Sequence, residues 1–441
     1  MQASALQTRE NQESFVASFA ACEGKFPGGE RMAALRRAAL DRFTVLGFPT
    51  TKNENWKYTN LAPFLRAAYE PAREARIEAV REKLAALPFA DLGCPRLVFV
   101  NGRYAPGLST PPEGVIACSL HEALVSGAAG AHLARYADIE NNSLAALNTA
   151  FVEDGAFIEI AKGKILEQPI YALYVAAHGG RAAVTYPRTL IVAGRESQAV
   201  VAEGYLALDG GAYFTNAVTE IAVAEGAVIE HEKLQLESAQ ALHTGLLRVE
   251  LGASSNFTSQ NVAMGGALAR NEISVVLEGD GASCSLYGLY AAQGTQHVDN
   301  HTTIDHAKPH TTSVELYKGI LDGRSQGVFH GRIIVRPEAQ KTDAVQRNKN
   351  LLLSDAASVN TKPQLEIYAD DVRCTHGATV GQVDPDAVFY LRSRGIALDA
   401  ARNLLTYAFT GDIIGKIRIE PIRSGLEKAL FEYLAGGTHE R

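Results

Sequence analysis

The sequence predicts a mainly β protein, with a β-solenoid core between helical regions at both ends. From Gly155 to about residue 383, short runs rich in β-branched residues follow one another without a helical period. Glycine-led turns separate these runs, and Gly252-Ala253-Ser254 is echoed by Gly281-Ala282-Ser283, 29 residues later. Gly226-Ala227 precedes the first of these two segments by 26 residues, so the repeats have similar lengths.

The repeat bears on the choice between two β architectures. A loose repeat of this length, made of short strands and tight turns, is typical of a solenoid, in which each repeat contacts only its neighbours. The repeat is imperfect, and a large β-sandwich is the alternative on the pattern alone. A solenoid would be a stiff scaffold whose strand edges and flat faces suit protein partners.

Three regions are expected along the chain: an N-terminal α-rich domain, a β core and a C-terminal helical domain, at residues 1–150, 151–383 and 384–441. In the first region the pattern predicts two helices within residues 10–47, and then a helix, a strand and a helix at Arg73–Leu87, Leu97–Val100 and Ser143–Phe151. In the last region it predicts three short helices, at Asp386–Arg394, Asp399–Phe409 and Ile422–Leu434. A bundle of that size buries too little surface to be stable alone, so it is expected to pack on the solenoid or to offer a face to a partner.

Composition and charge argue against several classes of protein. The 441 residues carry 42 basic and 49 acidic side chains, a net charge of −7, which argues against a nucleic-acid-binding surface. No run of about 18 apolar residues could span a membrane, and Met1–Glu13 lacks the apolar segment of a signal peptide. Five widely separated cysteines without a CxxC pair fit a reduced compartment, so a cytoplasmic protein is expected.

One short run near the C-terminal end holds the strongest candidate for chemistry. Apolar and polar residues alternate around Tyr368–Gly377, which predicts a strand. Side chains two apart on a strand share a face, so Cys374 and His376 are expected side by side. A thiol and an imidazole form a soft pair that suits iron, zinc or copper. Two ligands do not complete a metal site, and a lone cysteine is more often a buried core residue.

Five of the twelve histidines lie close together in the sequence, at His297, His301, His306, His310 and His330. Spacings of four and five residues would stack the first four on a helix and imitate a metal site. The residues between them are β-prone, so we expect the histidines on successive turns of a solenoid, at the surface or in turns. No ligand role is assigned to them.

Motifs for an enzyme that acts alone are absent from the sequence. Gly411–Ile417 is one residue short of a Walker A loop and ends in Ile417, where Ser or Thr must reach magnesium. Any ATP dependence must therefore come from a partner. Asp370 and Asp371 are adjacent on a predicted strand, point to opposite faces and cannot flank one glycosidic bond.

Several of these segments together resemble a known family. Lys341–Ala344, Asn348–Ser354 and Thr361–Gly381, continued by Phe389–Ile396, are similar to the C-terminal signature of the SufB/SufD family of iron–sulfur cluster assembly proteins. The early segment Asn53–Thr59 is similar to an N-terminal motif of the same family. The SufD branch is the closer match, because SufB proteins are usually longer and carry a cluster-forming cysteine and a glutamate where this chain reads Cys374-Thr375-His376-Gly377.

The resemblance implies a right-handed parallel β-helix between helical ends. It further implies a non-enzymatic scaffold subunit of a SufBCD complex, which pairs with SufB and docks the ATPase SufC through residues 384–441. In that family the cysteine and histidine of the motif lie at the interface with SufB, which implies that Cys374 and His376 bind iron or a nascent cluster there. A lowered thiol pKa or a bound iron would make Cys374 a thiolate, and the remaining ligands would come from the partner.

Some expectations about cofactors and partners stay open in the sequence. No permanently bound cofactor is expected, only a transient iron ion or iron–sulfur cluster, and no nucleic acid or membrane. The chain alone could be a monomer or a homodimer. The alternatives are a SufB-like primary cluster scaffold, or a β-helix polysaccharide-processing enzyme, which would need the secretion signal that Met1–Glu13 lacks.

Overall fold

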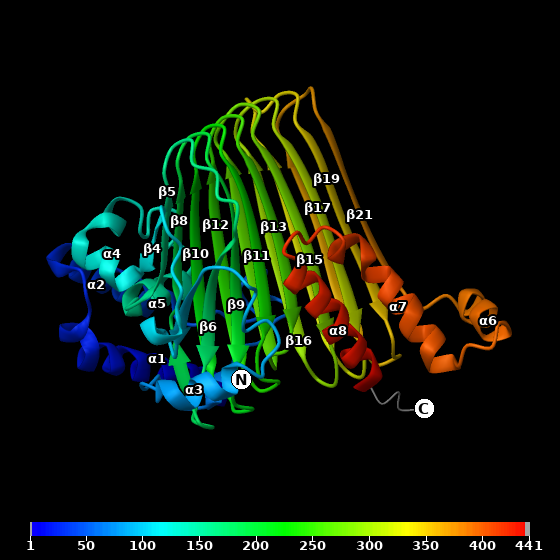
Figure 1. Cartoon of the computed structure of the whole chain (residues 1–441), viewed down its shortest axis with the longest axis horizontal. Helices are drawn as coiled ribbons and strands as arrows, with labels where there is room; N and C mark the ends of the chain where they lie inside the picture. Colours follow the sequence, from blue (N-terminus) through cyan, green and yellow to red (C-terminus); the bar gives the residue numbers. More distant parts are fainter. Residues whose placement is uncertain (1, 437–441) are drawn as a thin grey trace.

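Each turn of the core places one strand in each of two facing parallel sheets (Figure 1). The computed structural model describes residues 2–436. The first sheet has the order β4 (Ile116–Ser119), β5 (Gly155–Ile160), β8 (Arg188–Ala193), β10 (Phe214–Val223), β12 (Leu242–Leu251), β14 (Leu268–Leu277), β16 (His297–His306), β18 (Gln326–Val335) and β20 (Ser358–Ile367), and β7 (Ala183–Thr185) joins β10 to β1 (Glu70–Pro71). The second has the order β3 (Arg103–Tyr104), β2 (Arg96–Val100), β6 (Ile170–Ala176), β9 (Gln198–Ala207), β11 (Val228–Leu236), β13 (Asn256–Met264), β15 (Ser283–Ala292), β17 (Thr312–Leu321), β19 (Asp343–Leu352) and β21 (Arg373–Gly381). The predicted parallel solenoid is confirmed, and the β-sandwich alternative is wrong because, from β8 onward, each strand pairs in parallel with the strand two positions later in the chain.

The turns before six strands of the second sheet, β9, β11, β13, β15, β17 and β19, each use one left-handed residue. These residues are Glu196, Gly226, Ser254, Gly281, His310 and Lys341, each two positions before its strand and with φ between 53° and 69°. Each donates its backbone N–H to a carbonyl of the next turn, as Ser254 does to Asp280 at 2.8 Å. The structure therefore aligns Gly281 with Ser254, whereas the echo in the sequence had aligned it with Gly252. Glycine adopts this conformation most easily, but several other residues tolerate it, so the glycines alone did not reveal the repeat.

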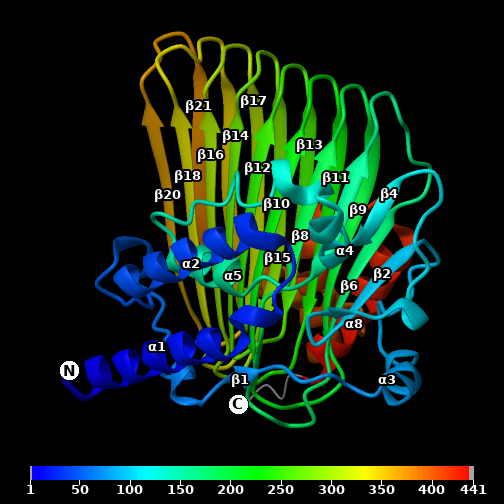
Figure 2. The same cartoon turned by 90° about the vertical axis from the view of Figure 1, so that its left-hand side faces the viewer.

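Helices of the N-terminal region cover the outer face of the first sheet (Figure 2). They are α1 (Gln2–Cys22), α2 (Gly29–Leu46) and α5 (Ser143–Phe151), while α3 (Ile77–Leu84) and α4 (Leu120–Ser126) lie nearer the edge. The helix predicted at Ser143–Phe151 is confirmed, and the side chain of Asn142 caps it by accepting from two of its first backbone N–H groups. Because β2 pairs with β6 and β4 with β5, residues before 150 also add strands to both sheets. The division into three domains stays a prediction.

The C-terminal helices lie on the second sheet. They are α6 (Pro385–Ser393), α7 (Leu398–Ile414) and α8 (Glu420–Gly436), close to the three predicted helices. Apolar residues of α7 and α8 pack on the outward side chains of β15 and β17, whereas α6 has no buried residue and projects from the body (Figure 1). Lys318 of β17 ties α7 to the sheet by donating to the carbonyl of Phe409 at 2.6 Å and to Asp412 at 2.8 Å.

A buried carboxyl group also holds the link between α7 and α8. Glu232 of β11 accepts the backbone N–H of Arg418 at 3.3 Å, and burial raises the pKa of Glu232 to about 7. A carboxyl group whose pKa is raised in the folded state contributes stability that is full below its unfolded pKa of about 4 and is lost as the pH rises through 7. Near pH 8 the chain therefore carries the cost of a buried charge at this position.

Glu232→Gln is expected to stabilise the protein at pH 8 by up to about 3 kcal/mol, since each pKa unit corresponds to about 1.4 kcal/mol. At pH 4, where the carboxyl group is neutral in both states, the substitution should change the free energy of unfolding little. Urea denaturation at both pH values measures the difference, with Glu113→Gln at the exposed surface as the control. An equal gain at both pH values would contradict the charge explanation.

Candidate functional site at the open end of the solenoid

The last turn of the solenoid has no neighbour on its outer side. Strand β20 pairs only with β18, and β21 pairs only with β19, within the part of the chain that the structure describes. Figure 2 shows both strands at the end of the stack away from β2 and β4. Their outer edges carry backbone N–H and C=O groups that are free to pair with another chain. We call this surface, formed by β20 and β21, the open end.

Cys374 and His376 lie on the same face of β21, as the alternation predicted. Their register partners on β19 are Ala344 and Gln346, both fully buried between the sheets. The two side chains therefore face the lumen, the interior space between the sheets, at its last turn. Cys374 is half-buried beside apolar residues such as Val335 and Ala344, while His376 is exposed.

The environment of Cys374 does not favour a thiolate in this chain alone. Burial raises the pKa of the Cys374 thiol, and the nearby carboxylate of Asp343 raises it further. The expected route through a lowered thiol pKa is therefore wrong, because desolvation and a negative charge both disfavour the anion. A bound metal ion remains the way to deprotonate Cys374.

The open end does not hold a complete metal site. Among residues 2–436, no three histidine, cysteine or acidic side chains gather closely enough to bind a metal ion together. Within this described range, Cys374 and His376 are thus two possible donors without a third beside them. Structural metal sites usually have four ligands, so these two donors do not complete one.

The five clustered histidines have other roles. His297, His301 and His306 lie on one strand, β16, so the expectation of successive turns is wrong for them. His306 faces the lumen, is fully buried, and forms hydrogen bonds with Thr311 and Ser313 at 2.8 and 2.9 Å. His310 takes the left-handed turn position, as a turn histidine was expected to do. The spacing of these histidines did not indicate their positions, because residues that face each other on adjacent strands of the sheet lie about 30 residues apart in the sequence.

His297 and His301 instead help to hold the early motif Asn53–Thr59 against the first sheet. The guanidinium carbon of Arg270 lies 3.9 Å from the ring centroid of Trp56. Arg270 also forms a buried ion pair with Asp299. His301 contacts Asp299 at 3.0 Å, and Thr59 bonds His297 at 2.9 Å. Trp56 is buried and so has a packing role, and sequence reasoning missed Asp299 and its partner Arg270 because Asp299 lies 240 residues after Thr59.

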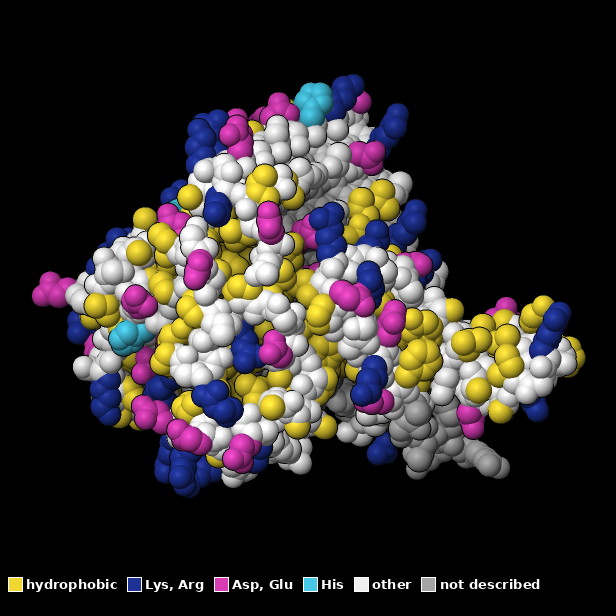
Figure 3. All heavy atoms as spheres, viewed as in Figure 1, with side chains coloured by type: hydrophobic (Ala, Val, Ile, Leu, Met, Phe, Trp, Pro, Cys, Tyr) yellow, Lys and Arg dark blue, Asp and Glu magenta, His cyan; other side chains and the backbone are white. Residues whose placement is uncertain are grey.

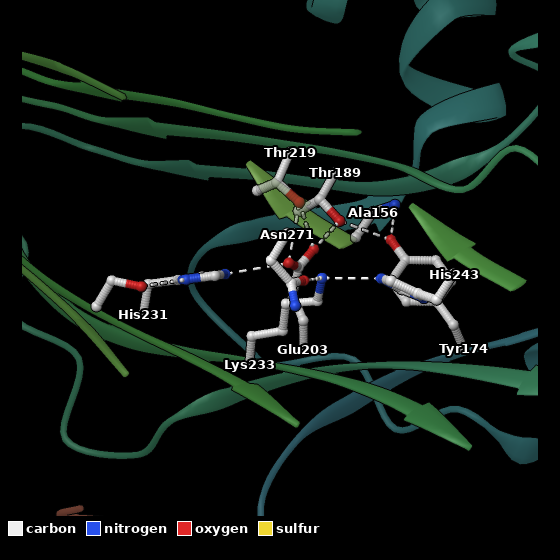
Figure 4. A network of polar contacts seen from close by, with 10 residues as sticks. Ala156, Tyr174, Thr189, Glu203, Thr219, His231, Lys233, His243 and Asn271 are labelled. Carbon is white, nitrogen blue, oxygen red and sulfur yellow. Dashed lines mark hydrogen bonds and ion pairs between the residues drawn. The ribbon is translucent and has the colours of Figure 1, made fainter. Parts of the chain in front are cut away.

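A second group of titratable side chains fills the middle of the lumen (Figure 4). Glu203 accepts from His231 at 3.1 Å, and Lys233 donates to His243 at 2.9 Å and to Asn271 at 2.7 Å. Burial lowers the pKa of Lys233 to about 8. These groups hydrogen-bond to one another between the two sheets, so we interpret them as support for the fold. In the sequence these residues appear only as isolated polar residues within β-prone runs, and such a pattern does not indicate a network.

Taken together, the fold and the open end define a parallel β-solenoid protein that presents a thiol, an imidazole and two unpaired strand edges at one end. Two family models match the chain: "SufBD protein N-terminal region" over residues 15–172 and "SUF system FeS cluster assembly, SufBD core domain" over residues 174–409. The chain belongs to the SufBD family of iron–sulfur cluster assembly proteins. The resemblance seen in the sequence is confirmed.

Individual relatives agree with this family over nearly the whole chain. The iron–sulfur cluster assembly protein SufD of Escherichia coli is 31% identical over 413 residues, which cover 93% of this chain and 95% of that protein. A SufBD family protein of Synechocystis is 32% identical over 408 residues, 90% of this chain and 89% of its own. The chloroplastic protein ABCI7 of Arabidopsis thaliana is 28% identical over 405 residues, with coverages of 88% and 83%. No helix within residues 2–436 is long and apolar enough to cross a membrane.

Proposed function

We propose that this chain is a non-enzymatic, SufD-type scaffold subunit of a SufBCD complex. In this proposal the open end pairs with a SufB-type subunit, and Cys374 and His376 contribute to a shared site for iron or a nascent cluster. The observation that carries the proposal is the position of these two donors on the inward face of the last strand, whose outer edge is unpaired. Iron and the cluster are cargo here, not a resident cofactor. Free cysteines and their wide spacing support a cytoplasmic location.

Pairing at the open end would satisfy the backbone of both sheets at once. Strand β20 spans ten residues and β21 nine, and natural proteins seldom leave edges of this length uncovered. The inward residues there include Leu365 and Val380, the second of which is 48% exposed. A second solenoid placed end to end would cover these side chains and extend both sheets.

The chemistry at such a junction follows from the two donors. Iron binding would displace the proton of the Cys374 thiol and overcome the raised pKa, since a positive ion stabilises the thiolate. Neutral His376 would supply a borderline-soft nitrogen beside it. Since both side chains face the lumen at its last, uncovered turn, ligands from the partner's last turn could reach them there.

Substitution of either donor tests this proposal. Cys374→Ala and His376→Ala, each co-expressed with the SufB and SufC partners, are expected to lower iron and acid-labile sulfide in the purified complex by roughly ten-fold or more. Cys94→Ala and His121→Ala, remote from the open end, are the matched controls. If both open-end variants form the complex and retain normal iron and sulfide, the ligand role is wrong.

The C-terminal helices are proposed to dock the ATPase SufC. Phe389 and Tyr390 of α6 are 73% and 56% exposed, and Figure 3 shows apolar side chains gathered on this projecting helix. Large exposed apolar side chains on an element held away from the core are typical of a protein interface. The Lys318 contacts hold α7 on the sheet, and α7 in turn supports the neighbouring helix α6.

Phe389→Asp is expected to weaken SufC binding by roughly ten-fold or more, because a buried charge replaces an aromatic anchor. Val45→Asp is the control, since Val45 is equally exposed, at 73%, on an N-terminal helix. Isothermal titration of SufC into each full-length variant measures the affinity. Equal affinities for the two variants would show that α6 is not the docking surface.

A further inference from the structure

His376 stands at the end of a row of polar side chains in the lumen. Glu315, Gln346 and His376 occupy the same register position on β17, β19 and β21. Glu315 and Gln346 are both fully buried and face the interior. The row therefore leads from a buried carboxyl group to the candidate ligand at the open end.

The side-chain amide of Gln346 is satisfied at one end only. Its Nε2 donates to Glu315 Oε2 at 2.7 Å. Its Oε1 is buried and accepts no hydrogen bond from any residue that the structure describes. An ionised carboxylate can only accept, so Glu315 keeps the amide nitrogen toward β17 and leaves the oxygen as the free end. Leaving a buried acceptor without a donor costs free energy of folding. We therefore expect a hydrogen-bond donor for this oxygen.

The register of the second sheet makes His376 a candidate donor for this oxygen. Across the lumen, Gly331 of β18 packs so closely that a Cβ there would lie 2.3 Å from Gln346 Nε2 and 2.7 Å from its Cδ. The amide is thus held against the opposite sheet. On its own sheet the next strand is β21, about 4.8 Å away, where His376 has the same register. Rotation of the His376 side chain between its rotamers would bring a ring N–H to this oxygen.

We propose that Gln346, oriented by Glu315, positions His376: the Gln346 side-chain oxygen accepts one imidazole N–H and leaves the other ring nitrogen free for iron. This inference rests on the proposed ligand role of His376. Metal-binding histidines commonly donate their second N–H to an oxygen acceptor, which fixes both the tautomer and the direction of the ring. Gln346 and Glu315 are positioning residues and do not touch the metal themselves.

The tautomer of His376 in the metal-free, full-length chain tests the inference. With ¹⁵N-labelled histidine at pH 8, above the pKa of about 7 that burial gives Glu315, the signals of His376 are identified by their loss in His376→Gln. One tautomer is expected to dominate in the wild type, and a mixture is expected in Gln346→Leu. Unchanged tautomer populations in Gln346→Leu would overturn the inference.

The lumen offers a matched control for this substitution. Gln235 of β11 is also fully buried, donates to Glu237 at 3.2 Å and has an unpaired Oε1, but it lies four strands from β19 in the second sheet. Gln235→Leu should therefore leave the His376 tautomer unchanged. If Gln346→Leu fails to fold, Glu315→Gln replaces it, because the Gln346 amide can then reverse and the mixture of tautomers should again appear.

A second readout separates this inference from the proposed function. In the complex with SufB and SufC, Gln346→Leu is expected to lower iron content roughly ten-fold, as the loss of an outer hydrogen-bond partner does at other metal sites. A changed tautomer with unchanged iron would support the positioning and contradict the ligand role of His376. An unchanged tautomer with lost iron would contradict the positioning alone.

Discussion

Arg188→Met is expected to lower the free energy of unfolding by about 3–5 kcal/mol, because it leaves a buried carboxylate without its cation. Arg188 and Glu220 are both fully buried on the outer face of the first sheet, and Arg188 Nε donates to Glu220 at 3.1 Å. Glu220 also accepts the backbone N–H groups of Ala134, Tyr136 and Ala137, so it anchors the segment before α5. Urea denaturation followed by circular dichroism measures the loss.

A second substitution separates the charge from the packing at this pair. In Arg188→Met/Glu220→Gln the neutral amide still accepts backbone N–H groups, so we expect it to recover at least about 1 kcal/mol of the loss. Arg332→Met is the matched surface control: its pair with Glu366 is partly exposed and should cost less than about 1 kcal/mol. Equal losses for the single and double variants would show that the unpaired charge is not the cause.

Arg270→Met is expected to have a similar effect, about 3–5 kcal/mol, and to release the Trp56 motif as well. Arg270 forms a buried ion pair with Asp299 and lies under the ring of Trp56. Trp56 is the only tryptophan, so its fluorescence reports the release directly, beside the global loss of stability. Unchanged Trp56 emission in a destabilised variant would contradict the link between the ion pair and the motif.

The pH dependence of this effect follows from Asp299. Burial raises the pKa of Asp299, but Arg270, His301 and Thr59 together outweigh burial and hold the pKa well below its usual range. A carboxyl group with a lowered pKa contributes stability that is present above its unfolded pKa of about 4 and is lost as the pH falls below that value. The difference in stability between the wild type and Arg270→Met should therefore be largest near neutral pH and shrink as the pH falls below 4, because protonation of Asp299 removes the charge that Arg270 compensates. A difference that stays constant below pH 4 would contradict this assignment.

The candidate site was predictable only in part. Strand alternation alone placed Cys374 and His376 on one face, because the side-chain direction on a strand is a local property. Whether that face contacts solvent, the core or a partner depends on the fold, because in the described residues no further turn of the solenoid follows β21. No local sequence pattern indicates where the solenoid ends. The raised pKa of the Cys374 thiol has the same origin, since burial raises it and Asp343, which belongs to the preceding turn, raises it further.

The sequence by itself determined the elements: β-branched runs with tight turns, helices at both ends, and a thiol and an imidazole two residues apart. Only the tertiary structure decided which residues meet. It aligned Ser254 with Gly281, placed Trp56 on Arg270, and placed Gln346 in register with His376 on the adjacent strand. The physical reason is that backbone preferences act between near neighbours, whereas register between turns is set by packing and hydrogen bonds across about 30 residues or more.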